Sequence, residues 1–246
     1  MSDAGELKGL LEKIAGLLPR YFLELGNLVS GPKEFVKSKD VYSDQAFESA
    51  LVFAAITVLL LFITMLTIYG INNLIVFLIL GYAASFISIG LISMSIMLAW
   101  RAVGWKRAAK PIFVVMLYYY AAINWMTIIL TLTYLGFLKS YAPTYHSSVL
   151  KSIRENEFNQ LGNKFSVLLE TAPPWESNTF SLGSVVASLG IVFILIWIFI
   201  GWGAFRNLSG LQKWKSGVAF ILFLLIFYLA GQVNSFILAA MYNKIE

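Results

Sequence analysis

A few polar side chains set within long apolar stretches are the residues of this chain best placed to do chemistry. Asn124 closely follows a run of three tyrosines that includes Tyr119, and Gln232 and Asn234 lie together near the C-terminus. Such groups can line a path for a neutral solute, or they can bond one membrane helix to another, with each bond contributing under about 2 kcal/mol. Both interpretations stay open at this point, and the packing role is the one that the sequence favours.

Residues for catalysis are scarce. His146 is the only histidine, and it lies between Tyr145 and Ser147 with no nucleophile motif nearby. The chain has no cysteine, and it contains no P-loop, dinucleotide fingerprint, H-E-x-x-H or calcium-loop pattern. We therefore expect no enzyme, no catalytic residue, no metal site and no cofactor.

The composition indicates that the protein works in a lipid bilayer. Of the 246 residues 59% are hydrophobic and 13% are charged, whereas soluble domains are about 25% charged. Four stretches contain no charged residue, and they cover residues 49–100, 111–138, 177–205 and 216–243. A helix needs about 20 apolar residues to cross a bilayer, so the first stretch can cross twice.

The fold predicted from these stretches is all-α and polytopic, with five transmembrane helices. The polar residues 70–73 divide the first stretch. The predicted spans are residues 51–69, 74–100, 111–137, 182–205 and 216–241. None of them contains a charged residue or a histidine, so the usual parts of a proton-coupled carrier are missing.

Two short loops carry an excess of basic residues and predict the orientation. Their members are Arg101, Lys106, Arg107, Lys110, Arg206, Lys213 and Lys215. Basic loops stay in the cytoplasm, which places the N-terminus inside and the C-terminus outside. The net charge of +5 therefore reflects contact with the lipid bilayer, and we expect no nucleic acid as partner. The lack of cysteine favours a bacterial cytoplasmic membrane, with the endoplasmic reticulum or Golgi membrane as the alternative for a eukaryotic source.

Residues 1–50 form a predicted cytoplasmic segment ahead of the membrane domain, which covers residues 51–246. Apolar side chains recur at three- and four-residue spacing over residues 5–29 and predict an amphipathic helix. Pro19 should kink or divide this helix, and Pro32 can begin a second, short one. The apolar face could lie on lipid, grip a partner, or pack on the chain's own spans.

The outer loop at residues 139–181 is the one sizeable polar insertion of the membrane domain. Its apolar spacing predicts one or two amphipathic helices, interrupted at residues 162–163. They could form a cap that binds a partner or ligand, or they could lie on the bilayer surface, which is the interpretation that the modest charge favours.

Small residues recur along three of the expected spans. The set is Gly81, Ser85 and Ser88 in the second span, Gly183, Ala187 and Gly190 in the fourth, and Gly231 and Ser235 in the fifth. Small side chains let helix backbones approach each other closely in lipid. The pattern predicts helix packing within the chain and is equally compatible with the seam of a homo-oligomer.

The chain resembles the Yip (Ypt-interacting protein) domain family of five-span membrane proteins. The resemblance is carried by Gly31-Pro32-Lys33-Glu34-Phe35-Val36 and Gln45-Ala46-Phe47-Glu48, and by the basic, tryptophan-containing loops at residues 104–110 and 208–217. It implies a five-span fold without catalytic residues. Eukaryotic family members bind prenylated small GTPases and act in membrane traffic, and some bacterial relatives lie beside ABC-type exporters. Of the D-L-x-G-P-type segment of the eukaryotic members, this chain keeps only the end.

Three functions compete on this sequence. The first is a non-enzymatic integral membrane scaffold or accessory protein that contacts another membrane protein or a second copy of itself. The second is a transporter or channel for a neutral or amphipathic solute, lined by Asn124, Tyr119, Gln232 and Asn234. The third is an enzyme acting on lipid through His146. The absence of ionised groups in the spans favours the first.

Overall fold

A computed structural model describes residues 3–69, 74–141, 143, 146–147 and 178–242. Over these residues the protein is all-helical and has no strand. The helices are α1 (Asp3–Ser30), α2 (Pro32–Ser38), α3 (Asp44–Tyr69), α4 (Leu74–Ala102), α5 (Lys110–Tyr141), α8 (Asn178–Ser209) and α9 (Lys213–Tyr242). The helices expected in the outer loop fall at residues 148–177 and lie outside the described part of the chain.

Four of these helices are long and apolar enough to cross a membrane. The crossing stretches are Asp44–Thr64 in α3, Gly81–Ala102 in α4, Lys110–Ser140 in α5 and Leu182–Ser209 in α8. Helix α9 covers the fifth expected span as one helix. Many of its side chains lie outside the described set, so its crossing stays a prediction.

The helix ends fall where the local sequence predicts them. Helices α3 and α4 end and begin on either side of the polar residues 70–73. Gly104 follows α4 with a φ of 99°, and Gly210 follows α8 with a φ of 66°. Glycine adopts this left-handed conformation without a steric cost, which is why it commonly follows the end of a helix.

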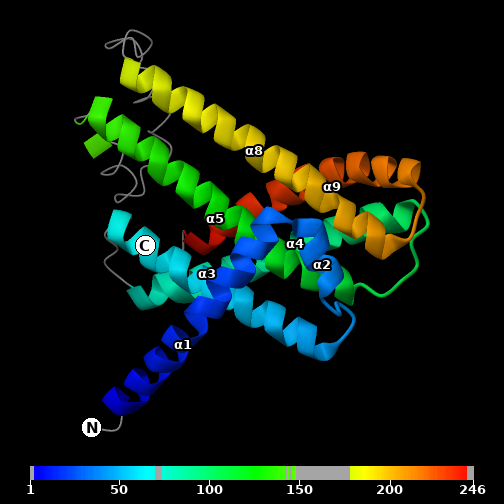
Figure 1. Cartoon of the computed structure of the whole chain (residues 1–246), viewed down its shortest axis with the longest axis horizontal. Helices are drawn as coiled ribbons and strands as arrows, with labels where there is room; N and C mark the ends of the chain where they lie inside the picture. Colours follow the sequence, from blue (N-terminus) through cyan, green and yellow to red (C-terminus); the bar gives the residue numbers. More distant parts are fainter. Residues whose placement is uncertain (1–2, 70–73, 142, 144–145, 148–177, 243–246) are drawn as a thin grey trace.

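Helix α5 occupies the middle of the bundle. It packs against α3, α4 and α8, and α9 packs on the far side against α4. Helices α1 and α2 form a bent pair that crosses this bundle, where α1 contacts α5 and α2 contacts α8 (Figure 1). The core therefore includes side chains of the N-terminal pair as well as of the crossing helices.

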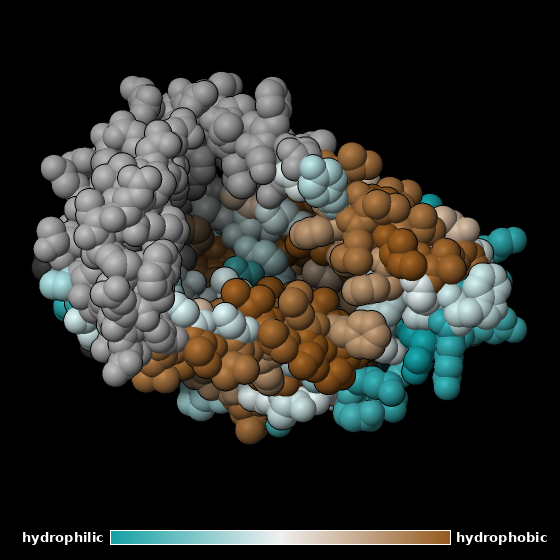
Figure 2. Space-filling model, turned by 90° about the horizontal axis from the view of Figure 1, so that it is seen from above, coloured by the Kyte–Doolittle hydropathy of each residue, from teal (hydrophilic) through white to brown (hydrophobic). Residues whose placement is uncertain are grey.

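The surface of the described part is apolar along the helices and hydrophilic at one end. Figure 2 shows hydrophobic residues over the middle of the molecule and hydrophilic residues gathered at the end opposite the uncertain segment. That hydrophilic end holds the connections between α4 and α5 and between α8 and α9 (Figures 1 and 2). An apolar middle with a polar end suits a protein embedded in a bilayer.

Pro19 was expected to kink or divide the N-terminal helix. It does not divide α1, which runs as one helix from Asp3 to Ser30, and a kink at this proline stays a prediction. Proline removes one backbone hydrogen bond, but neighbouring helices can hold the chain through such a point. Here Leu18, Tyr21 and Leu25 pack against the core on both sides of the proline. The second break occurs as expected, because α2 begins at Pro32 with Gly31 as its N-cap.

Candidate functional site

The N-terminal pair is attached to the bundle by a chain of hydrogen bonds that starts at Tyr21. The indole Nε1 of Trp125 donates to the Tyr21 hydroxyl oxygen at 2.6 Å, and that hydroxyl lies 2.7 Å from Thr57 Oγ1. Thr57 already donates its only hydroxyl hydrogen to the Phe53 carbonyl at 2.9 Å, so Tyr21 must be the donor toward Thr57. The chain thus joins α1 to α5 and α3 with every donor used.

Burial keeps this phenol in the protonated form. Tyr21 is 3% exposed, and loss of solvent raises its pKa above the usual 10.0, which its hydrogen bonds with Thr57 and Trp125 partly offset. The hydroxyl therefore holds its hydrogen at neutral pH, as the direction of the bond to Thr57 requires.

A second set of bonds holds the joint between α1 and α2. Trp197 Nε1 of α8 donates to the Val29 carbonyl at 2.9 Å, which is one of the last carbonyls of α1 and has no partner within that helix. The Tyr119 hydroxyl lies 3.1 Å from the Gly201 carbonyl and 3.4 Å from the Pro32 carbonyl. Side chains of α5 and α8 therefore meet at the joint.

Apolar packing completes the attachment. Leu28 is fully buried, and Phe35 and Val36 of α2 are 7% and 4% exposed. The Phe35 ring meets the Tyr118 ring edge-on, with centroids 5.0 Å apart, and the Phe53 ring lies 5.1 Å from the same Tyr118 ring. The N-terminal pair is therefore part of the hydrophobic core. For residues 16–38 this favours packing on the chain's own helices over contact with lipid or with a partner protein.

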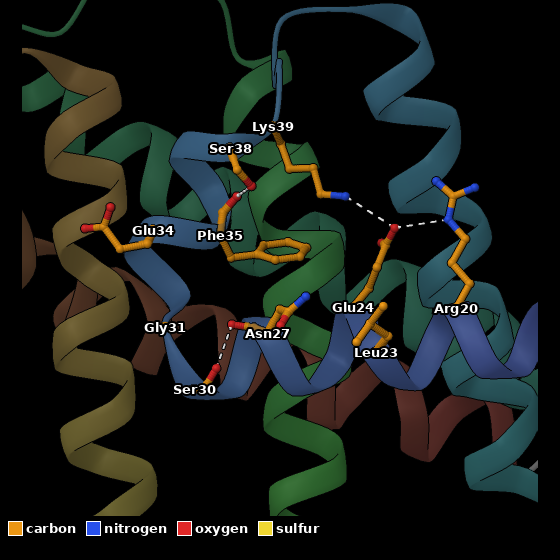
Figure 3. A pocket seen from close by; sticks show the side chains of 10 residues that line it. All are labelled: Arg20, Leu23, Glu24, Asn27, Ser30, Gly31, Glu34, Phe35, Ser38 and Lys39. Carbon is orange, nitrogen blue, oxygen red and sulfur yellow. Dashed lines mark hydrogen bonds and ion pairs between the residues drawn. The ribbon is translucent and has the colours of Figure 1, made fainter.

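Beside this apolar packing, the pair carries a network of ionised groups. The Glu24 carboxylate accepts a hydrogen bond from Arg20 Nε and forms an ion pair with Lys39 Nζ, each at 3.4 Å. The Lys39 ammonium also lies 4.9 Å from the Phe35 ring centroid and 5.6 Å from that of Tyr118, within the range of a cation–π contact. Figure 3 shows Arg20 and Lys39 converging on Glu24 from α1 and from the end of α2.

Two hollows flank the joint. The larger, of about 540 Å³, lies between α1 and α2 and is lined by Arg20, Leu23, Glu24, Asn27, Ser30, Gly31, Glu34, Phe35, Ser38 and Lys39 (Figure 3). The smaller, of about 310 Å³, lies between the joint and an apolar face of α8 that includes Phe193, Ile196 and Ile200. The larger one, which we call the ion groove, combines charged, amide and apolar groups at one place.

The two basic loops meet at the hydrophilic end of the bundle. Arg107 Nη1 donates to the Leu208 carbonyl at 3.2 Å, and Lys110 pairs with Asp44 at the start of α3. Arg101, Lys106 and Lys213 are exposed. Of the seven basic residues predicted in these two loops, Lys110 is the one that pairs with a carboxylate among the described residues. We call this surface the basic end.

Aromatic side chains support the basic end from within. Trp100 stacks on Trp202 with ring centroids 5.3 Å apart, and Trp202 Nε1 donates to Ser216 Oγ at 3.1 Å. Arg206 and Lys215 are half-buried beside the loops, and the Lys215 ammonium lies 5.7 Å from the centroid of the exposed Trp214 ring. Rigid indole packing therefore fixes both loops relative to each other.

The polar residues predicted for a solute path do not gather in the described part. Tyr119 is 4% exposed and bonds to α2 and α8, while Asn124 Nδ2 donates to the Tyr120 carbonyl of its own helix at 2.8 Å. Five residues apart, the two side chains project from different faces of α5. The side chains of Gln232 and Asn234 lie outside the described residues.

Several of the predicted small residues lie where helices approach closely. A Cβ on Gly81 would fall within 1.7 Å of Phe62 in α3, one on Gly183 within 2.8 Å of Phe137, and one on Gly190 within 2.4 Å of Leu130. Ser85 forms a side-chain bond with Tyr120, and Ser88 and Ala187 are half-buried. Nothing lies within 4 Å of such an atom on Gly231, and the Ser235 side chain is not described.

The described residues around His146 supply no catalytic partner for it. It is half-buried, and the neighbouring Ser147 Oγ donates to the Pro143 carbonyl at 2.9 Å. Among the described residues, no cluster of three or more histidine, aspartate or glutamate side chains could hold a metal ion. These observations add nothing to the interpretation as a lipid-modifying enzyme.

The sequence did not predict the ion groove, although one signal was present. Arg20 and Glu24 are spaced by four residues, which places them on the same side of a helix, beside the face that holds Tyr21 and Leu28. Lys39 joins them because the chain turns back at Gly31, and only the fold shows how far that turn goes.

Comparison with known proteins adds no relative. No protein family, no curated protein and no solved structure matches this chain. The resemblance to the Yip domain family therefore stays a prediction.

Proposed function

We propose that this protein is a non-enzymatic scaffold or accessory protein of a cell membrane, acting through protein contacts at its basic end. The supporting observation is the filled centre of the bundle. Tyr119 is buried, with its ring 5.1 Å from Trp197 and 5.6 Å from Phe205. A path for a solute beside α5 would need open space around Tyr119. Because aromatic rings fill that space, the geometry favours a scaffold over a transporter.

The basic end supplies a surface for such contacts. Basic side chains from two loops gather there, and the stacked indole rings of Trp100 and Trp202 pack behind them. Charged surfaces of one sign steer partners of the opposite sign and set the register of binding. We therefore propose an acidic segment of a larger membrane complex as the partner, and a transport complex is the kind that the resemblance to the Yip family suggests.

In the proposed topology five helices cross the membrane, with the N-terminus in the cytoplasm and the C-terminus outside. The Asp44–Lys110 ion pair joins the start of α3 to the start of α5. The Arg107–Leu208 bond joins the α4–α5 connection to the end of α8, so these parts lie at one end of the bundle. Five crossings by α3, α4, α5, α8 and α9 agree with that grouping. A bacterial cytoplasmic membrane is the proposed location, where such basic loops face inward.

Labelling tests the topology directly, because the chain has no cysteine. Single cysteines at Asn72 and Ala108 are exposed to an impermeant maleimide in intact cells. We expect labelling at position 72 alone. Labelling at position 108 with protection at 72 would reverse the proposed orientation.

Site-specific crosslinking tests the proposed contact. A photoreactive maleimide is attached to Lys106→Cys at the basic end, and to Lys139→Cys near the other end of α5 as the matched control. We expect a discrete heavier product in native membranes from position 106 only, and its yield should fall with salt. Recovery of the protein alone from both variants, at low and high salt, would contradict the scaffold function.

Flux measurements test the alternative. Proteoliposomes holding the purified protein are expected to show no more solute leakage than empty liposomes. Flux that is abolished by Asn124→Leu would favour a transporter for neutral or amphipathic solutes instead.

A further inference from the structure

We propose that the ion groove between α1 and α2 binds the phosphate headgroup of a membrane phospholipid. This inference concerns a different surface from the basic end and does not rest on the proposed function. It starts from the shape of the groove, which has a volume of about 540 Å³ and is lined by both charged and apolar side chains. An amphipathic ligand is the kind that such a mixed lining suits.

The groove holds hydrogen-bond donors that the protein itself does not use. Arg20 uses only Nε to bond with Glu24, and 77% of its side chain is exposed. The two Nη groups make no hydrogen bond with any described residue, and neither does the Asn27 side-chain amide. Guanidinium groups pair with phosphate through parallel hydrogen bonds, so these donors have the geometry for a phosphate oxygen pair.

The charge of the groove fits a single negative charge. Arg20 and Lys39 supply two positive charges and Glu24 one negative charge. The remaining carboxylate, on Glu34, points away from this trio (Figure 3) and is paired with Lys37 at 3.0 Å. The trio therefore has one positive charge in excess, which a phosphodiester balances.

The depth of the groove along α5 is close to the depth at which a lipid headgroup lies in a bilayer. The Lys39 ammonium lies over the Tyr118 ring, and the Phe35 ring meets it edge-on. Tyr118 is about 12 Å along α5 from Lys110 at 1.5 Å per residue. Helix α5 has 32 residues and is therefore about 48 Å long. If it is centred in a hydrocarbon layer of about 30 Å, each edge of that layer lies about 9 Å from a helix end. Ionised groups facing hydrocarbon are costly, whereas a headgroup drawn to this edge solvates them.

The acyl chains have an apolar surface to follow. Leu23, at the rim of the groove, is 66% exposed. A lipid with its phosphate on Arg20 would therefore place an acyl chain against Leu23 at the rim of the groove.

Native mass spectrometry of the full-length protein, purified and delipidated in detergent, tests this site. The protein is titrated separately with phosphatidylglycerol, phosphatidylethanolamine, diacylglycerol and inorganic phosphate. Two variants perturb the groove in different ways, because Arg20→Gln removes the free guanidinium and Asn27→Trp fills the space with no change of charge. Lys139→Gln removes one exposed charge near the opposite end of α5 and serves as the matched control.

We expect one phospholipid to bind the native protein. Arg20→Gln should weaken that binding about tenfold, the effect of losing one charge-assisted hydrogen bond, and Asn27→Trp should weaken it at least as much by occupying the space of the headgroup. Lys139→Gln should change it less than about twofold. Weakening with both phospholipids indicates recognition of the shared phosphate, and weakening with phosphatidylglycerol alone indicates an anionic headgroup. Equal binding of diacylglycerol, equal loss in the control, unchanged binding in both folded groove variants, or full competition by inorganic phosphate would each overturn the proposal. If Arg20→Gln does not fold, Asn27→Trp alone decides.

Discussion

Helices α5 and α8 are both apolar enough to cross a bilayer, yet they relate to the rest of the protein in opposite ways. Within their apolar stretches, 56% of α5 is buried and only 11% of α8. Helix α8 is the more apolar of the two, so hydropathy alone would place it at the centre. In lipid, apolar side chains gain nothing from burial among other helices, and close packing and polar contacts decide instead.

Small and aromatic residues of α8 make several of its contacts with α5 and the N-terminal pair. Gly183 and Gly190 lie against Phe137 and Leu130 of α5, and Trp197 bonds to the end of α1. The rest of the helix exposes large apolar side chains such as Leu189 and Phe199, at 64% and 67%. Variants on the two sides of α8 should therefore behave very differently.

The largest effect is expected from Gly183→Leu. Its Cβ would fall 2.8 Å from Phe137 Cβ, an atom fixed close to the backbone that cannot move aside. Overpacking of this kind costs about 1–3 kcal/mol, which should lower the midpoint of thermal unfolding in detergent. Gly136→Leu is the control, because nothing lies within 4 Å of a Cβ there. Equal stability of the two variants would mean that α5 and α8 do not pack as described.

Trp197→Phe should follow in size. It removes the donor to the Val29 carbonyl and keeps most of the ring packing, so we expect a loss of about 0.5–1.5 kcal/mol. Amide hydrogen exchange should rise at the end of α1. Phe199→Leu, on the exposed face of α8, should leave the exchange unchanged, and a rise in that variant too would point to a general loosening of α8.

Tyr21→Phe should have a similar or smaller effect. The change breaks the bonds to Trp125 and Thr57, while Thr57 keeps its bond to Phe53. Side-chain bonds between membrane helices contribute about 0.6 kcal/mol on average and up to about 1.7 kcal/mol. Unfolding of Tyr21→Phe, Trp125→Phe and the double variant should show non-additive losses. Strict additivity would mean that the two residues do not interact.

The smallest effect is expected from Asp44→Asn. Its ion pair with Lys110 lies at the water-exposed end of α3, where ion pairs contribute little and are screened by salt. The unfolding midpoint should stay within experimental error at low and at high salt. A clear drop at low salt would show that this pair helps to hold the helix ends together.

The sequence predicted the crossing helices well because their signal is local. Charge-free stretches and the polar residues 70–73 place the ends of α3, α4, α5 and α8 close to where they occur. The small residues at 81, 183 and 190 also carried a usable signal, since only a missing side chain permits such close approaches. The break before Pro32 was local in the same sense, whereas continuity through Pro19 depended on contacts from other helices.

The sequence determined by itself that the chain is helical, that it suits a bilayer, and where its basic loops fall. These properties depend on short runs of residues and on the cost of placing charge in hydrocarbon. The tertiary structure alone decided that α5 lies at the centre, that Tyr21 is buried between α3 and α5, and that Arg20, Glu24 and Lys39 share one groove. Those arrangements join residues far apart in the chain, and periodicity gives no information about which helix an exposed face will meet.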